Sequence, residues 1–357
     1  MYAGFVVNRW RRSKRNARRP NRTEIPVNMG TGSLLVMVGL VALSPPLFVG
    51  DFTLFQLTQA LIYAIAILGL NLLTGFNGQF SLGHSAFYAL GAYSTAILMD
   101  QWGVVYYWTI IPAGVIGLVA GVLFGLPALR LEGLYLALAT FALAVATPQL
   151  LKYDGFEGVT GGAQGIDLDK PVSPIAMLSD DEWLYYFVLM VTVVLFLGAW
   201  NLARGRVGRA MIAIRDNPIA AKTTGIDIAL YKSLTFGVST FYTGVAGALG
   251  AIVVQFVAPD SFTFFLAITL LVGSVIGGIT SIFGAVFGGF FVLLVPNLAE
   301  TVADMLGRTD AKGLSWATYG IFLILAVYVM PGGAAEIGKR IIMALSDRKG
   351  FRSPDES

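Results

Sequence analysis

The sequence predicts an all-α membrane protein that crosses the bilayer about ten times, with some helices broken or re-entrant. Hydrophobic residues make up 56% of the 357 residues, charged residues only 13%, and the mean hydropathy is +0.73. Apolar runs of about 20 residues, each long enough to cross about 30 Å of hydrocarbon, recur along the chain. The 42 glycines suit close helix packing in lipid, where small residues let backbones approach.

The apolar runs divide the chain into a membrane domain, 33–331, a basic arm, 1–32, and a tail, 332–357. Pro45 and Pro46 interrupt the first expected span, and the glycine-rich stretch Gly75–Gly78 opens the third. The expected spans are Ser33–Val49, Thr53–Leu73, Phe80–Met99, Val104–Leu126, Leu134–Leu151, Leu184–Leu202, Ser233–Val257, Phe262–Ile282, Phe283–Leu298 and Leu314–Met330. The eighth and ninth of these spans, Phe262–Ile282 and Phe283–Leu298, are separated by so short a connection that they could instead form a re-entrant pair.

The distribution of charge predicts the orientation of these spans. With an even number of crossings, 20 of the 24 basic residues fall on the side of both termini, which the positive-inside rule makes cytoplasmic. The other side receives the long loop 152–183, with seven acids and two lysines. The Arg-rich start has no apolar core before Ser33, so we expect a lipid-contacting arm and not a cleavable signal.

Several functional classes are disfavoured by what the sequence lacks. There is no Cys and a single His, so neither disulfides nor the usual metal clusters are expected. No GxxxxGKS/T loop occurs, so we expect ATP to be bound elsewhere and no enzymatic activity in this chain. The spans hold almost no ionisable residues, which argues against a proton relay. Sodium coupling stays open, because backbone carbonyls of broken helices can bind sodium.

The polar segment 204–232 lies between two long apolar runs and carries six basic residues against two acids. Asp216 or Asn217 can cap a short helix beginning at Pro218, and Gly225 can end that helix. Two short helices meeting at a corner are therefore expected. They could form an interfacial amphipathic loop, or an element that docks into a groove of a cytoplasmic partner.

The residues of this segment carry a family resemblance. Ile219-Ala220-Ala221, followed after three residues by Gly225, resembles the EAA-xxx-G loop of bacterial ABC importer membrane subunits, with isoleucine in place of glutamate. The Ile-x-Leu-Pro that usually follows this loop is absent. The fuller run Gly208–Gly225 is closer to the LivM-type permease subunits of branched-chain amino-acid importers.

Other stretches agree with that family in order and spacing, so the resemblance covers about Leu57–Met330. These stretches are Gly78–His84 leading to Gly91–Tyr93, Gly133–Thr140, Thr160–Gly162 with Gly165, and Gly273–Gly289. The resemblance implies a subunit of the bacterial inner membrane that pairs with a second, homologous permease. It also implies two cytoplasmic ATPase subunits, which bind ATP and Mg²⁺, and a periplasmic binding protein that delivers an amino acid; nucleic acid is not an expected partner.

The resemblance makes segment 204–232 the coupling element that contacts an ATPase. The residues expected to contact the ATPase or to shape this element are Arg209, Arg215, Asp216, Ala220, Ala221 and Gly225. For Gly225, ending the helix is the expected role.

The translocation pathway is expected near the start of the third span. Asn77, Gln79, Ser81, His84 and Ser85 cluster there and would face the bundle interior if the helix is broken. They could line the pathway. The alternative is that small polar residues pack helices closely and His84 is a hydrogen-bonded core residue.

The outer loop 152–183 could contact the binding protein through Thr160, Gly161 and Gly162, or simply form a turn-rich connection. The resemblance suggests branched-chain or other hydrophobic amino acids as substrates. Urea and short-amide importers have similar permeases, and a secondary carrier or channel is a further alternative.

Overall fold

The structure is a computed structural model that describes residues 45–131, 133–305, 320 and 333. The chain divides into two units, 1–48 and 49–357. Of the first unit only the short helix α3 (Pro45–Phe48) is described. The basic arm, nearly all of the expected first span and the expected last span lie outside the described residues, as does the tail apart from Gly333.

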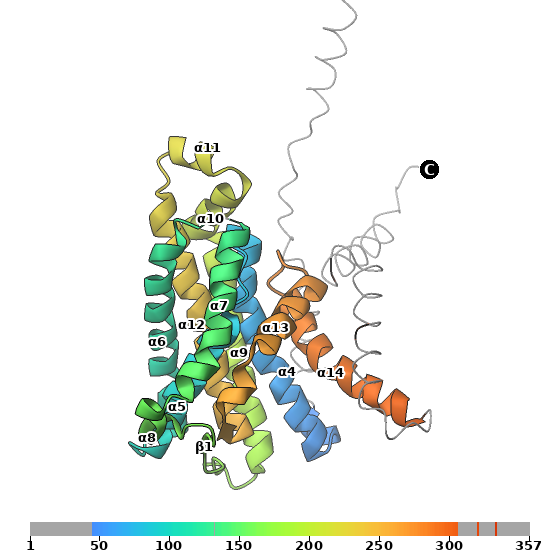
Figure 1. Ribbon diagram of the computed structural model, residues 1–357. Helices are drawn as coiled ribbons and strands as arrows, with labels where there is room; N and C mark the ends of the chain where they lie inside the picture. Colours follow the sequence, from blue (N-terminus) through green and yellow to red (C-terminus); the bar gives the residue numbers. More distant parts are fainter. Residues whose placement is uncertain (1–44, 132, 306–319, 321–332, 334–357) are drawn as a thin grey trace, which may run out of the picture. The chain divides into compact units, whose positions relative to one another are not determined.

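The described part of the second unit is built mainly of helices (Figure 1). The long ones are α4 (Asp51–Leu70), α5 (His84–Asp100), α6 (Tyr106–Ala128), α7 (Leu134–Leu151), α9 (Asp180–Arg204), α12 (Ile228–Val254), α13 (Phe264–Gly277) and α14 (Gly284–Met305). Among the described residues, five segments are long and apolar enough to cross a membrane: α4 with its extension to Phe76, α6, α7, α9 and α12. A multi-pass membrane protein is thereby confirmed, whereas the full number of spans stays a prediction.

Helices α4 and α12 form the centre of this unit. In each of these two segments, 83% of the residues in an apolar stretch of 18 are buried within the protein, compared with 22% in α9. Helix α12 packs against α4, α5 and α6, while α14 and α9 also cover α4. The outer helices α7 and α9 expose large apolar side chains such as Leu138 and Val194, as expected for helices that face lipid.

Glycines set the distance between the packed helices. A Cβ on Gly91 of α5 would collide with the carbonyl oxygen of Gly244 on α12. On α13 and α14, Gly277 faces Gly284 in the same way, and Gly273 faces Gly288. Each of these two helices thus carries a GxxxG spacing on the face that meets the other. Because lipid gives helices little hydrophobic drive to associate, this close backbone contact stabilises the pair.

Two interruptions break the helices at one level of the unit. Helix α4 widens at its end into a π-helical turn, η1 (Asn71–Phe76), and residues 77–83 are irregular before α5 begins. In the third expected span, residues 80–83 are irregular and the helix begins at His84 and not at Phe80, whereas a broken or re-entrant course of this span stays a prediction. Helix α13 ends at Gly277 because Gly278 adopts a φ of +107°, which leaves a turn at 278–283 before α14.

The basic and acidic connections lie at opposite ends of this unit, as the charge pattern predicts (Figure 1). Helices α10 (Arg206–Asp216) and α11 (Pro218–Thr223) occupy one end. The other end holds the remaining short elements. These are η2 (Asp154–Phe156), α8 (Glu157–Thr160), β1 (Ile166–Asp167), β2 (Phe256–Val257) and η3 (Pro259–Phe262). Strands β1 and β2 pair antiparallel, with Ile166 opposite Val257, and so tie the acidic loop to the end of α12.

We expect Gly91→Leu to destabilise the protein by more than the ~1–3 kcal/mol typical of overpacking, because backbone and not a flexible side chain blocks the new atoms. The effect is measured as the melting temperature in detergent. Unfolding is monitored by the loss of the monodisperse peak in size-exclusion chromatography. Leu90→Ala, a neighbouring exposed position, is the control. Equal melting temperatures for the two variants would contradict the close contact of α5 with α12.

Candidate functional site

The corner between α10 and α11 forms because side chains cap the chain where it changes direction. The Asn217 side-chain oxygen accepts a hydrogen bond from the Ala220 N–H at 3.1 Å, and Pro218 occupies the first helical position. Both features are those predicted from the sequence, with Asn217 as the cap. Asp227 caps α12 in the same way, by accepting from the Leu230 N–H at 3.1 Å.

The end of α11 is a Schellman motif around Gly225, which has a φ of +83°. The Gly225 N–H donates to the carbonyl of Lys222, and the Ile226 N–H donates to the carbonyl of Ala221, each at 3.1 Å. Only glycine adopts this conformation without strain. The prediction that Gly225 ends the helix is confirmed.

Helix α10 is fixed to the membrane domain by one apolar face. Ala210, Met211 and Ile214 are buried, and the helix packs against α9, α12 and η1. Burial of a side chain the size of Met211 or Ile214 contributes about 1.5–3 kcal/mol. The helix is therefore held by its own packing and not merely suspended in a loop.

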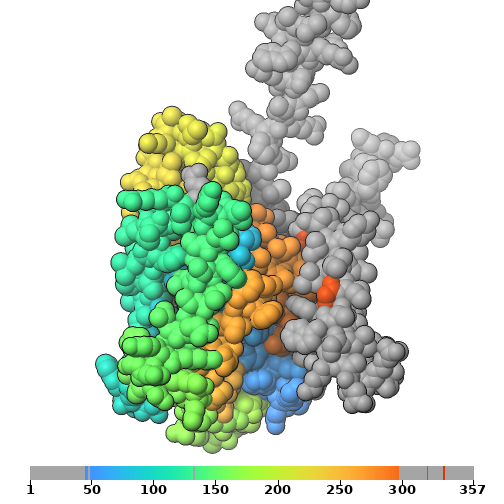
Figure 2. All heavy atoms as spheres, viewed as in Figure 1, coloured from blue at the N-terminus to red at the C-terminus, as the bar shows by residue number. Residues whose placement is uncertain are grey.

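Helix α11 presents a different surface. Ile219 is 80% exposed and Ala220 is exposed beside it, whereas Ala221 is only 3% exposed and packs inside the corner. The two helices form a projection at one end of the unit (Figure 2). Arg209, also exposed, donates from Nη1 to the carbonyl of Arg204 at 3.0 Å and so covers the end of α9. Of the predicted coupling residues, five are exposed to a partner and Ala221 alone is buried, where it shapes the corner; the exposed residues are Arg209, Arg215, Asp216, Ala220 and Gly225.

Arg215 joins α10 to the end of α4. Its Nη1 donates to the carbonyl oxygen of Gly75 at 2.7 Å, and its Nη2 lies 2.9 Å from Oδ1 of Asp216. Gly75 lies in the last turn of η1, where carbonyls have no partner within the helix. A Cβ on Gly78 would lie 2.9 Å from the Arg215 Cγ, and one on Gly75 would collide with the carbonyl of Ile279. The side chain thus meets both the π turn and the irregular segment that follows.

The π turn also holds the second interruption, between α13 and α14. The Asn71 side-chain amide donates from Nδ2 to the carbonyls of Ser281 at 3.0 Å and Gly278 at 3.4 Å. Its Oδ1 accepts from the Ser274 hydroxyl at 2.6 Å. Asn71 is buried, so these bonds satisfy groups that water cannot reach. Both helix breaks and α10 therefore converge on residues 71–76.

His84 lies in a buried chain of hydrogen bonds. The Ser239 hydroxyl donates to the carbonyl of Gly69 at 2.6 Å, so its oxygen accepts from the His84 Nε2, 2.8 Å away. The His84 Nδ1 then accepts from the Ser81 hydroxyl at 3.1 Å. A neutral imidazole satisfies every group in the chain. This geometry favours the interpretation of His84 and Ser81 as hydrogen-bonded core residues that fix the start of α5.

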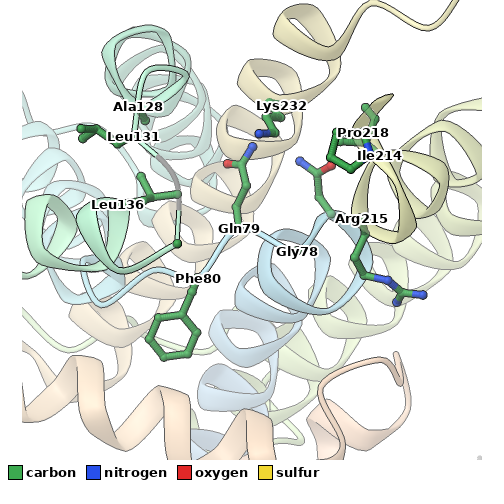
Figure 3. Close-up of a pocket in the computed structure, with 12 residues that line it drawn as sticks. Gly78, Gln79, Phe80, Ala128, Leu131, Leu136, Ile214, Arg215, Pro218 and Lys232 are labelled. Carbon is green, nitrogen blue, oxygen red and sulfur yellow. The ribbon is translucent and has the colours of Figure 1, made fainter. Parts of the chain in front are cut away.

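Asn77 and Ser85 lack such partners. Both are buried, and neither the amide of Asn77 nor the hydroxyl of Ser85 has a hydrogen bond to the part of the chain that the structure describes. Asn77 and Gln79 line a pocket of about 160 Å³ at the α10 end, together with Lys232 at the start of α12. Figure 3 shows the side chains of Gln79 and Lys232 pointing toward one another, while the Arg215 guanidinium points away. The five predicted pathway residues thus cluster at the break, and their role in transport stays a prediction.

The predicted contact residues of the outer loop shape a turn. The Thr160 hydroxyl is buried and donates to the carbonyl of Leu151 at 2.8 Å, and its oxygen accepts from the Gly162 N–H at 3.3 Å. Gly161 ends α8 with a φ of +70°. The neighbouring Gln164 is exposed. Contact with a binding protein stays a prediction, and Gln164 is better placed for it than the buried Thr160.

Three residues of this region were not predicted from the sequence: Asn71, Ser239 and Lys232. An asparagine inside an apolar span is itself a signal, because a buried amide in a membrane needs partners. Lys232 was counted only for its charge. Among the described residues, no group of three acidic, histidine or cysteine side chains could hold a metal ion.

Comparisons with known proteins place the chain in a family. A family model described as "Branched-chain amino acid transport system / permease component" matches residues 52–330. A relative in Escherichia coli K12, "High-affinity branched-chain amino acid transport system permease protein LivM", is 32% identical over 80% of this chain and 74% of its own length. The LivH permease protein of the same organism is 24% identical over 76% of this chain and 90% of its own.

These matches define the class: the protein is a membrane-embedded permease. More particularly, the chain belongs to the family of branched-chain amino-acid transport permeases, and it is of the LivM type. A probable LivM permease of Methanocaldococcus jannaschii is 26% identical over 77% of this chain and 82% of its own length. No solved structure matches the chain.

Because the natural chain has no cysteine, Gln79→Cys places a single thiol at the irregular segment. We expect Arg215→Met to raise the rate of maleimide labelling of this thiol several-fold, since the segment loses its contact with α10. Arg209→Met removes a guanidinium from the other end of α10 and is the control. If the Gln79→Cys thiol is labelled at the same rate with arginine and with methionine at position 215, Arg215 does not hold the segment.

Proposed function

We propose that this chain is the permease subunit of an ATP-driven importer of branched-chain or other hydrophobic amino acids. The observation that carries the proposal is the set of hydrogen bonds that connects α10, beside the exposed helix α11, to two helix breaks within the membrane domain. The relatives are named as branched-chain amino-acid transport permeases, which supports the same substrate class. The chain would have no ATPase site of its own, and ATP and Mg²⁺ would be bound by two separate subunits.

Coupling would begin at α11. Ile219 and Ala220 offer an exposed apolar surface that suits insertion into a groove of an ATPase subunit. Movement of α11 would pass to α10 through the buried corner at Ala221, and from α10 to the π turn through Arg215. In this scheme Ala221, Gly225, Arg215 and Asp216 are positioning residues, and Ile219 and Ala220 form the contact.

Translocation would involve the interrupted helices. Residues 77–83 and 278–283 both contact the π turn, so a shift of η1 would displace the starts of α5 and α14 together. The Gln79 N–H donates to the carbonyl of Leu73 at 3.2 Å, which links the irregular segment to the same turn. Backbone that leaves regular structure within a membrane has to be buried in protein or to line a watery cavity. Asn77, Gln79 and Ser85 are the residues of this region with polar groups available to a passing solute.

We also propose the remaining organisation that the family resemblance implies. The subunit would lie in the inner membrane with about ten spans and both termini in the cytoplasm, and loop 152–183 would face a periplasmic binding protein. Gly333, which follows the last expected span, packs against Gly278 and so supports a tail that begins on the α10 side. LivM and LivH relatives both exist, which favours pairing with a paralogue over pairing with a copy.

The alternative of a urea or short-amide importer keeps the same architecture and differs in the delivered solute. A secondary carrier or channel would transport without ATPase subunits. The projecting α10–α11 corner favours the importer, because a carrier has no need of such a surface. Uptake of labelled leucine by the reconstituted complex, with and without ATP, separates these functions.

Ile219→Glu should reduce co-purification of the ATPase subunits at least ten-fold, because a buried carboxylate would replace an apolar contact. The measurement is the ratio of ATPase to permease after affinity purification in detergent. Met177→Glu introduces the same charge at an exposed apolar position of the outer loop and should leave the ratio unchanged. Retention of the full complement of ATPase by Ile219→Glu would refute docking through α11.

The orientation can be tested with single cysteines at the two ends of the protein. An impermeant maleimide added to spheroplasts should label Met177→Cys, and it should label Ile219→Cys only after the membrane is permeabilised. Both positions are highly exposed, so accessibility within the protein does not limit either reaction. The opposite pattern of labelling would invert the topology.

A further inference from the structure

Three exposed arginines surround the junction where α9 ends and α10 begins. Arg204 is the last residue of α9, and Arg206 and Arg209 follow in the first part of α10. The Arg209 Nη1 donates to the carbonyl of Arg204 at 3.0 Å, which directs the Arg209 side chain back toward α9. Positive charge is therefore concentrated at this junction, and the three residues are called the arginine cluster below.

No acid lies near the arginine cluster in the sequence. Between Glu182 and Asp216 the chain holds neither Asp nor Glu. The Asp216 carboxylate lies 2.9 Å from the guanidinium of Arg215, which is outside the cluster. Among the described residues, none of the ion pairs involves an arginine of the cluster. The neighbouring chain thus leaves the positive charge unbalanced, and an anion from outside the chain would stabilise it.

The cluster lies at the end of a helix face that is open to lipid. Leu197, Asn201 and Arg204 are exposed and follow the i, i+4, i+7 spacing of one face of α9. Only 22% of the apolar stretch of this helix is buried within the protein. Arg204 therefore lies where an exposed apolar face gives way to polar sequence, which is the level of the phospholipid headgroups.

Aromatic side chains adjoin the arginines on the apolar side. The Arg204 Cζ lies 3.9 Å from the centre of the Trp200 ring, a cation–π contact that uses none of the five N–H donors of the guanidinium. The centre of the Trp200 ring lies 5.1 Å from that of Phe283. Phe283 is exposed, and so is Phe287 one turn further along the chain. Cationic groups and exposed apolar surface therefore meet at one place, as the binding of a phospholipid requires.

The position of the cluster separates it from the surface proposed to contact an ATPase. Helix α10 has 11 residues, so Arg206 lies about 15 Å along the helix from the corner that leads to α11. The exposed Ile219 belongs to α11, beyond that corner. Of the predicted coupling residues only Arg209 belongs to the cluster. A headgroup at the start of α10 and an ATPase at α11 could thus be bound together.

We propose that the arginine cluster binds the headgroup of an anionic phospholipid from the leaflet on the α10 side, and that this lipid anchors the start of α10. The phosphate would accept hydrogen bonds from Arg204 and Arg206, because guanidinium groups bond phosphate oxygens in a bidentate manner. An acyl chain would lie along Trp200 and Phe283. A zwitterionic lipid would bind less tightly, since its own cation is repelled by the cluster. The inference rests on the membrane location of the chain and not on the solute that it transports.

The test is a lipid titration of the complete transporter in detergent, followed by native mass spectrometry. Phosphatidylglycerol and phosphatidylcholine with the same acyl chains are the two probes. Basic residues near the membrane surface attract anionic lipids, so we expect phosphatidylglycerol to bind at least about ten-fold more tightly. Soluble glycerol 3-phosphate at the same concentration should not displace it, because that anion has no acyl chains.

The double variant Arg204→Gln, Arg206→Gln should weaken the binding of phosphatidylglycerol at least about ten-fold and leave that of phosphatidylcholine unchanged. The corresponding double change to lysine keeps the charge and should retain part of the preference. Arg130→Gln is the matched control, because it removes an exposed arginine from the turn between α6 and α7 and should leave both affinities unchanged.

A melting experiment shows whether the bound lipid holds the folded protein. Phosphatidylglycerol should raise the melting temperature of the natural protein and of Arg130→Gln, and it should not raise that of the double glutamine variant. Without lipid, the natural protein and the double glutamine variant should melt alike, since both substituted side chains are exposed. If the glutamine variant does not fold, the double lysine variant provides the comparison.

Three results would overturn the inference. The first is equal affinity of the natural protein for the two lipids, or an affinity for phosphatidylglycerol that the double glutamine variant keeps. The second is displacement of phosphatidylglycerol by glycerol 3-phosphate, which would identify a site for free phosphate compounds. The third is loss of the ATPase subunits from the double glutamine variant with lipid binding intact, which would make the cluster a protein interface. Neither ATP nor uptake enters these measurements, so they stand apart from a failure of the proposed function.

Discussion

The π-helical turn that ends α4 is largely buried within the protein, where its backbone has no water to bond. A helix leaves its last carbonyls without partners, and within a bilayer the protein itself has to supply them. Here the carbonyl of Gly75 is met by Arg215 of α10, and that of Leu73 by the backbone of Gln79. Asn71 bonds the turn between α13 and α14 from the same π-helical segment. One requirement, the satisfaction of polar groups at a helix end, therefore joins helix α10 to two helix breaks in the membrane domain.

This junction also explains the use of glycine. Gly75 permits the backbone of Ile279 to approach, and Gly78 leaves room for the Arg215 side chain. Larger residues at either position would separate elements that have to move together. The close packing of α13 on α14 through facing glycines joins the two helices, so in the proposed mechanism a force applied at the turn between them would displace both.

Much of the fold could be predicted because its signals are local. Apolar runs located the central helices, and the cap at Asn217, the proline after it and Gly225 defined α11 correctly. Long-range contacts could not be predicted in this way. The sequence placed Arg215 in a coupling loop, but nothing in it says that the guanidinium meets a carbonyl 140 positions away. Burial likewise separates Ala221 from its neighbour Ala220, although the two are identical in sequence terms. The pathway residues were found as a cluster, yet their division into bonded and unpaired groups depends on Ser239 of a distant helix.

The central claim is that Arg215 transmits movement and does not merely hold an ATPase. The measurement that tests it most directly is the number of leucine molecules imported per ATP hydrolysed by the reconstituted complex with Arg215→Met. We predict that ATPase subunits remain bound and hydrolyse ATP, while this ratio falls several-fold because the end of α4 no longer follows α10. A ratio equal to that of the natural protein, or a loss of ATPase binding that accounts for the whole defect, would contradict the claim.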